Sequence, residues 1–135
     1  MDRRRKKVIC ERIADGDKLF FSPDGRFWVW DEGDRCYRDA ESGEIGEDTQ
    51  SLCALPFLNL KEEALRFIEE NRNLYRKRYL SLLHKTGDAR EAAWKLLIDL
   101  DDEGEGEDWA DFCDYRNRKA ERILDEWMAE MFRKR

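Results

Sequence analysis

Apolar residues in the second half of the chain recur every three or four positions, which is the spacing of one face of an α-helix. One such stripe occupies residues 60–83, and two more flank an acidic segment at residues 99–108. Gly87 and Asp88 indicate a helix end followed by a new start, because the Asp88 carboxylate can accept hydrogen bonds from free backbone N–H groups. The pattern therefore predicts three helices in residues 60–135, of which the last two form a helical hairpin.

The first half of the chain carries shorter apolar runs, separated by Gly, Asp and Pro residues that form turns. The runs are rich in aromatic and β-branched residues, which favour strands. They lie at residues 7–13, 18–22, 26–30 and 35–38. Their regular spacing predicts an antiparallel β-meander of about four strands over residues 6–46. An apolar connection, residues 47–59, then leads to the helical part.

One predicted strand is apolar on both of its faces. Strand alternation places Trp28 and Trp30 on one face and Phe27 and Val29 on the other. One face should pack on the helices. The other is either covered by the apolar segment 52–58 or left as a binding surface, with the two tryptophans as its apolar anchors.

Composition favours a folded protein over a disordered one. The chain has 135 residues, the size of one ordinary domain, and 41% of them are hydrophobic although 43% are charged. We therefore expect a single α+β domain, residues 1–135, in which the helical part packs on one face of the sheet. The net charge of −6 argues against a general affinity for nucleic acid and favours an acidic contact surface.

The sequence indicates no bound metal or cofactor and no membrane segment. The four cysteines lie far apart and the chain has one histidine, so neither a zinc site nor a redox motif is expected. Reduced, buried thiols are typical of a reducing compartment. The apolar run after Arg3–Lys7 is too short for a secretion signal, and no window is long enough to cross a membrane. We expect a cytoplasmic protein without a membrane partner.

The acidic segment resembles part of an EF-hand calcium loop over residues 99–111. Asp99, Asp101, Glu103 and Glu107 fall at positions that supply oxygen ligands, with Gly104 at the sharp turn. The position that normally holds a bidentate Glu is Ala110, and no second such loop accompanies this one. A calcium-responsive protein is therefore an alternative hypothesis, and a solvated acidic connection is the expectation.

The same segment suggests a second role that needs no metal. A dense row of carboxylates can imitate a phosphate backbone and occupy the basic groove of a nucleic-acid-handling protein. The opposite hypothesis is direct nucleic-acid binding. Its surface would combine the basic start Arg3–Lys7 with Arg72, Arg76, Lys77 and Arg78, which are interleaved with Tyr75 and Tyr79. Against it, we expect these tyrosines to face the core and the basic residues to form a solvated helix face.

Catalysis has little support in the sequence. His84 is the only histidine, and no Ser or Cys has a partner at a spacing typical of a nucleophile and base. We therefore predict a small non-enzymatic protein-binding module that acts as an inhibitor or regulator of a nucleic-acid-handling protein. Its predicted partner-binding residues are Trp28, Trp30, Asp101, Asp102, Glu103, Glu105 and Glu107.

Overall fold

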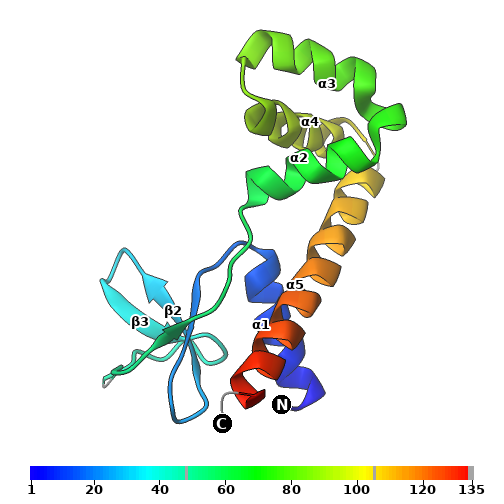
Figure 1. Ribbon diagram of the computed structural model, residues 1–135. Helices are drawn as coiled ribbons and strands as arrows, with labels where there is room; N and C mark the ends of the chain where they lie inside the picture. Colours follow the sequence, from blue (N-terminus) through cyan, green and yellow to red (C-terminus); the bar gives the residue numbers. More distant parts are fainter. Residues whose placement is uncertain (48, 105, 134–135) are drawn as a thin grey trace. The chain divides into compact units, whose positions relative to one another are not determined.

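The computed structural model of the protein describes residues 1–47, 49–104 and 106–133. Figure 1 shows its helices and strands, which divide into two compact units. We call residues 1–58 together with 117–135 the sheet unit, and residues 59–116 the helical unit. The α+β class is confirmed, whereas the order and number of elements differ from the prediction.

The amino-terminal run, predicted as a strand at residues 7–13, is instead the helix α1 (Arg3–Ala14). Asp2 caps this helix, because its side chain accepts a hydrogen bond of 2.9 Å from a backbone N–H group in the first turn. Ile9 and Ile13 lie four residues apart and are both fully buried. The prediction was wrong because it weighed the β-branched residues of this run and overlooked the four-residue spacing of its apolar positions.

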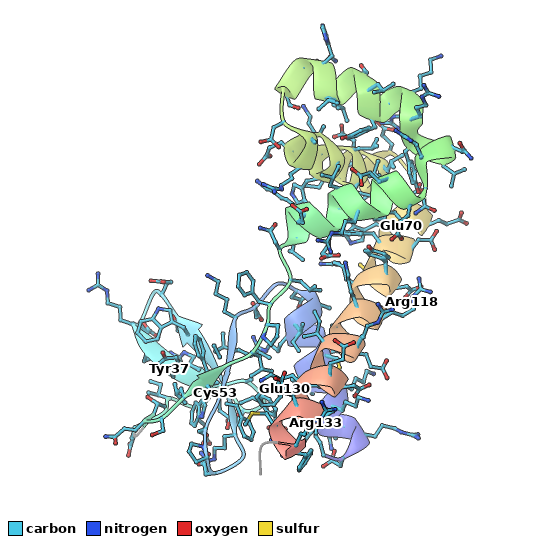
Figure 2. The ribbon with its side chains drawn as sticks, in the orientation of Figure 1. Tyr37, Cys53, Glu70, Arg118, Glu130 and Arg133 are labelled. Carbon is cyan, nitrogen blue, oxygen red and sulfur yellow. The ribbon has the colours of Figure 1, made fainter. Side chains whose placement is uncertain are left out.

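The sheet unit contains a four-stranded antiparallel sheet in the order β3-β2-β1-β4. Its strands are β1 (Leu19–Phe21), β2 (Phe27–Asp31), β3 (Cys36–Asp39) and β4 (Cys53–Ala54). The first three coincide with predicted strands. The fourth comes from the predicted connection, where Cys53 pairs with Phe21 at the sheet edge (Figure 2). The predicted number of strands is therefore correct, and the fourth strand was assigned to the wrong segment.

The core of the sheet unit is formed by side chains from the sheet, α1 and α5 (Glu107–Arg133). Phe27 of β2, Ile9 of α1 and Leu124 of α5 are all nearly or fully buried in it. Each such side chain contributes roughly 1.5–3 kcal/mol on burial, whereas an exposed ion pair contributes about 0–1 kcal/mol. Apolar packing therefore holds α1 against α5 more strongly than surface ion pairs do.

The helical unit contains three complete helices and the first turns of α5. The complete helices are α2 (Leu60–Glu70), α3 (Arg72–Thr86) and α4 (Ala89–Glu103). Helix α4 packs against both α2 and α3, which contact each other much less (Figure 1). The core side chains include Phe67, Leu96, Leu97 and Phe112.

The helix predicted over residues 60–83 is divided at Asn71. The backbone there has φ −109° and ψ 32°, and the Asn71 side-chain amide donates a 2.8 Å hydrogen bond to the carbonyl of Phe67. This side chain satisfies a carbonyl at the end of α2 and so favours a helix end. The described residues therefore contain five helices, where three were predicted. Within residues 1–47, 49–104 and 106–133, no helix is both long and apolar enough to cross a membrane.

The predicted boundary between the next two helices is confirmed. Gly87 ends α3 with a left-handed φ of 68°, and the Asp88 carboxylate accepts hydrogen bonds of 2.9 Å and 3.1 Å from two backbone N–H groups of α4.

The predicted hairpin of the last two helices describes only part of α5. Residues of α5 up to Arg116 belong to the helical unit, and those from Asn117 onward belong to the sheet unit.

We expect Leu96→Ala in the helical unit and Leu124→Ala in the sheet unit each to lower the free energy of unfolding by about 2–5 kcal/mol. Both side chains are fully buried, so truncation leaves a cavity. Because α5 supplies residues to both cores, both variants should shift one shared transition. Urea unfolding followed by circular dichroism and tryptophan fluorescence measures this. Two transitions, each moved by only one variant, would contradict the prediction of a single domain.

Candidate functional site

Trp28, a predicted apolar anchor, is only 5% exposed. Its indole N–H donates a 2.9 Å hydrogen bond to the hydroxyl of Ser22. The connection after β3 covers the ring so closely that a Cβ atom placed on Gly46 would lie 2.8 Å from the indole carbon Cζ3. Trp28 is therefore covered at least in part by the connection near Gly46, and it is not displayed to a partner.

Trp30, the second predicted anchor, is partly exposed and belongs to a row of aromatic rings. Its ring packs edge-on against Tyr37 of β3, with centroids 4.8 Å apart. Tyr37, labelled in Figure 2, packs in turn against Phe20 of β1 at 5.4 Å. The row therefore holds Trp30 in place while leaving part of its surface accessible.

A concave apolar site lies elsewhere on the sheet unit, and we call it the methionine pocket. It has a volume of about 180 Å³. It contains all three methionines of the chain. Its lining residues are Met1, Arg5, Phe21, Gly25, Phe27, Trp127, Met128, Met131 and Phe132.

One wall of the methionine pocket is fixed by aromatic packing. The rings of Phe21 and Phe27 have centroids 4.9 Å apart, and that of Trp127 lies 5.2 Å from Phe21. Arg5 donates a 2.9 Å hydrogen bond to the Gly25 carbonyl, and its guanidinium also pairs with a carboxylate outside the pocket. The positive charge of Arg5 is therefore already compensated, and the pocket remains apolar.

The opposite wall comes from the last turns of α5. Met128, Met131 and Phe132 recur there at helical spacing, next to Trp127. Phe132 is 66% exposed although its ring is apolar. Methionine side chains are flexible and polarisable, so this wall can adapt to the shape of an inserted group. The sequence predicts these residues only as part of the apolar helical stripe that follows residue 108, and it does not predict the pocket. Their clustering on one helix face was the available signal.

The methionine pocket is suited to binding rather than to catalysis. Among the residues that the structure describes, Arg5 is the only charged residue of the lining, and none of the lining residues is a carboxylate, histidine or cysteine. A dry apolar cavity of about 150 Å³ is large enough to bind benzene. The methionine pocket therefore has room for one apolar side chain of about that size.

The candidate calcium ligands of the alternative EF-hand hypothesis lie within helices rather than in a loop. Asp99, Asp101 and Glu103 all lie within α4, and side chains two positions apart on a helix point in nearly opposite directions. Only residues 104–106 separate α4 from α5. Across residues 1–47, 49–104 and 106–133, no group of three or more His, Cys, Asp or Glu side chains could hold a metal ion.

The predicted acidic residues lie at the end of α4 and the start of α5. Asp101, Asp102, Glu103 and Glu107 are exposed, and Glu105 lies outside the described residues. Glu103 forms a 2.9 Å ion pair with Arg78 of α3. The structure thus places four of the five predicted carboxylates on the surface of the helical unit.

Tyr75 and Tyr79 do not display their rings as the nucleic-acid hypothesis requires. Tyr75 is buried, and its hydroxyl donates a 2.5 Å hydrogen bond to the Asp108 carboxylate. Burial, and then this carboxylate, raise the pKa of the Tyr75 phenol. Tyr79 is partly buried against the same core. The tyrosines therefore contribute to packing, as expected, while the basic residues between them are exposed.

The histidine and the cysteines of the chain are residue types often used in catalysis. His84 is exposed on α3, and the four cysteines are free thiols. Burial raises the pKa of the Cys10 thiol, so its reactive thiolate form is disfavoured at neutral pH. These residues give no specific support to an enzymatic role.

We expect Trp28→Ala to lower the free energy of unfolding by about 3–5 kcal/mol, because its large buried side chain is lost. Trp30→Ala should cost about 1 kcal/mol, since this ring is partly exposed. Ser22→Ala, which removes the acceptor of the indole N–H, should cost about 1–3 kcal/mol. Thermal and urea unfolding measure all three. Loss of partner binding by Trp28→Ala at unchanged stability would show instead that Trp28 is a surface anchor.

Comparisons with models of protein families, with curated proteins and with solved structures found no match to this chain. The geometry of its surfaces is therefore the basis for the function proposed below.

Proposed function

We propose that the protein is a non-enzymatic protein-binding module whose methionine pocket receives an apolar side chain of a partner protein. The observation that carries the proposal is the pocket itself, a concave site of about 180 Å³ with an almost wholly apolar surface. Concave apolar sites with few polar groups are the usual form of binding sites. Four free thiols are in keeping with a cytoplasmic location, which forms part of the proposal.

The composition of the pocket explains why a protein side chain is the proposed occupant. Aromatic rings and methionines dominate its lining, and both are enriched in the centres of protein interfaces. Inserting one large apolar side chain removes its surface from water and contributes roughly 1.5–3 kcal/mol. Met1 and Phe132 are exposed at the pocket, so a partner would also cover apolar surface around the inserted side chain.

Cross-linking from the pocket tests this proposal in the full chain. A photoreactive phenylalanine analogue replaces Phe132, and the same analogue at Ile45 is the control, because Ile45 is also exposed on the sheet unit but does not line the pocket. We expect irradiation in source-cell lysate to attach a partner at position 132 and not at position 45. Met128→Glu, which places a charge in the pocket wall, should reduce that product at least about tenfold.

Mass spectrometry identifies the attached proteins, and circular dichroism verifies that Met128→Glu remains folded. If it does not, Met131→Gln provides a milder change of the same wall. Equal products from positions 45 and 132, or a product at 132 that persists in the folded pocket variants, would contradict the proposal.

A second candidate function is inhibition or regulation of a nucleic-acid-handling protein through the acidic surface of the helical unit. The observation that favours it is the exposure of Asp101, Asp102 and Glu107. Residues 99–114 also contain no Lys or Arg. Such a surface would be attracted to a basic groove that normally holds nucleic acid, and the attraction would weaken with salt.

Neutralising the acidic surface tests this second function. We expect the triple variant Asp101→Asn, Asp102→Asn, Glu107→Gln to lose at least about tenfold in its inhibition of source-cell nucleases or polymerases. The matched control neutralises Glu32, Glu44 and Glu47, three exposed carboxylates of the sheet unit. Inhibition that is absent in the wild type, or equal in both variants, would reject the function.

A further inference from the structure

Helix α3 leaves large apolar side chains exposed on its surface. Of its 15 residues, only Tyr75 is buried. Leu74 is 76% exposed and Leu80 is 50% exposed. Single exposed leucines are common on protein surfaces. Leu80 is of interest because it also lies beside a groove.

The charge of α3 is of one sign. Residues 72–86 contain five Lys or Arg residues and no Asp or Glu. Arg78 pairs with Glu103, whereas Arg72, Arg76 and Lys77 form no ion pair with any of the residues that the structure describes. The basic groups near the start of α3 are therefore available to an external anion.

These apolar and basic features meet in a groove between α2 and α3, with a volume of about 290 Å³. Ile68 of α2 and Tyr79 and Leu83 of α3 supply much of its apolar lining, and Leu80 lies at its exposed side. Arg72 and Arg76 also line it. Figure 2 labels Glu70, which ends α2 just before this turn of the chain.

The α3 residues that line the groove form one continuous stripe. Arg72, Arg76, Tyr79, Leu80 and Leu83 are spaced by three or four residues, so they share one helix face. At about 1.5 Å per residue the stripe extends about 16 Å, or three helical turns. Its first half is basic and its second half is apolar.

We propose that this groove docks an acidic segment of a partner protein, one that carries carboxylates beside an apolar side chain. The carboxylates would pair with Arg72 and Arg76, whose planar guanidinium groups can each bind a carboxylate through two parallel hydrogen bonds. The apolar side chain would pack against Tyr79, Leu80 and Leu83. Glu69 is the one carboxylate among the described lining residues, and it disfavours a segment that is acidic along its whole length.

Nucleic acid fits the groove less well than an acidic peptide does. Recognition of unpaired bases uses exposed aromatic rings for stacking, but Tyr75 is buried and Tyr79 is partly buried. The freely exposed apolar groups of α3 are aliphatic leucines, which pack on apolar side chains. The groove also belongs to the helical unit, so it is a separate site from the methionine pocket of the sheet unit.

Selection from a displayed library of random peptides tests the proposal with the full chain. We expect wild-type protein to enrich peptides that combine Asp or Glu with Leu, Ile or Phe. In fluorescence anisotropy, Arg76→Glu should weaken a selected peptide at least about tenfold, and raised salt should weaken it further. Lys77→Glu is the matched control, because it makes the same charge change on the adjacent residue outside the groove lining, and it should cost less than about threefold.

A second pair of variants separates groove contact from general charge attraction. Leu80→Ser should weaken the peptide and Leu74→Ser should not, since both leucines are exposed but only Leu80 lines the groove. The proposal is overturned if no peptide is enriched, if the enriched peptides lack acidic residues, or if Arg76→Glu and Lys77→Glu act equally. Tighter binding to phosphatidylserine vesicles or to single-stranded DNA than to the selected peptides would also overturn it.

Discussion

The structure depends on one uninterrupted helix, α5, that contributes buried side chains to two hydrophobic cores. Phe112 is fully buried in the helical unit, and Ala120 and Leu124 are fully buried in the sheet unit. The same helix begins at Glu107, beside the acidic end of α4, and its last turns form one wall of the methionine pocket. A change that shortened or bent α5 would therefore affect the packing of both units and the two surfaces at its ends.

Much of the fold could be predicted where local chemistry and periodicity agree. The boundary at Gly87 and Asp88 was correct, because a left-handed glycine and a capping carboxylate act within a few residues of each other. The amino-terminal helix was missed because its β-branched residues favour a strand while its buried positions follow a helical spacing. The break at Asn71 was missed because an apolar stripe can continue across a helix end.

The candidate site was harder to predict than the fold, because a periodic pattern does not distinguish a buried side chain from one that lines a pocket. Trp28 and Trp30 share a sheet face, yet only Trp28 is covered by the connection near Gly46. That contact joins residues far apart in the chain, so no local pattern signals it. Met128, Met131 and Phe132 belong to the same stripe as the buried Leu124, and only the structure shows that they border a cavity.

The presence of every methionine of the chain in one pocket has a consequence for its chemistry under oxidising conditions. Oxidation of a methionine thioether to the sulfoxide replaces a soft apolar sulfur with a polar S=O group, and reductases can reverse the change. Sulfoxides at Met128 and Met131 would place two strong hydrogen-bond acceptors in an apolar wall that offers them few donors. The affinity of the pocket for an apolar group would then follow the redox state of its surroundings.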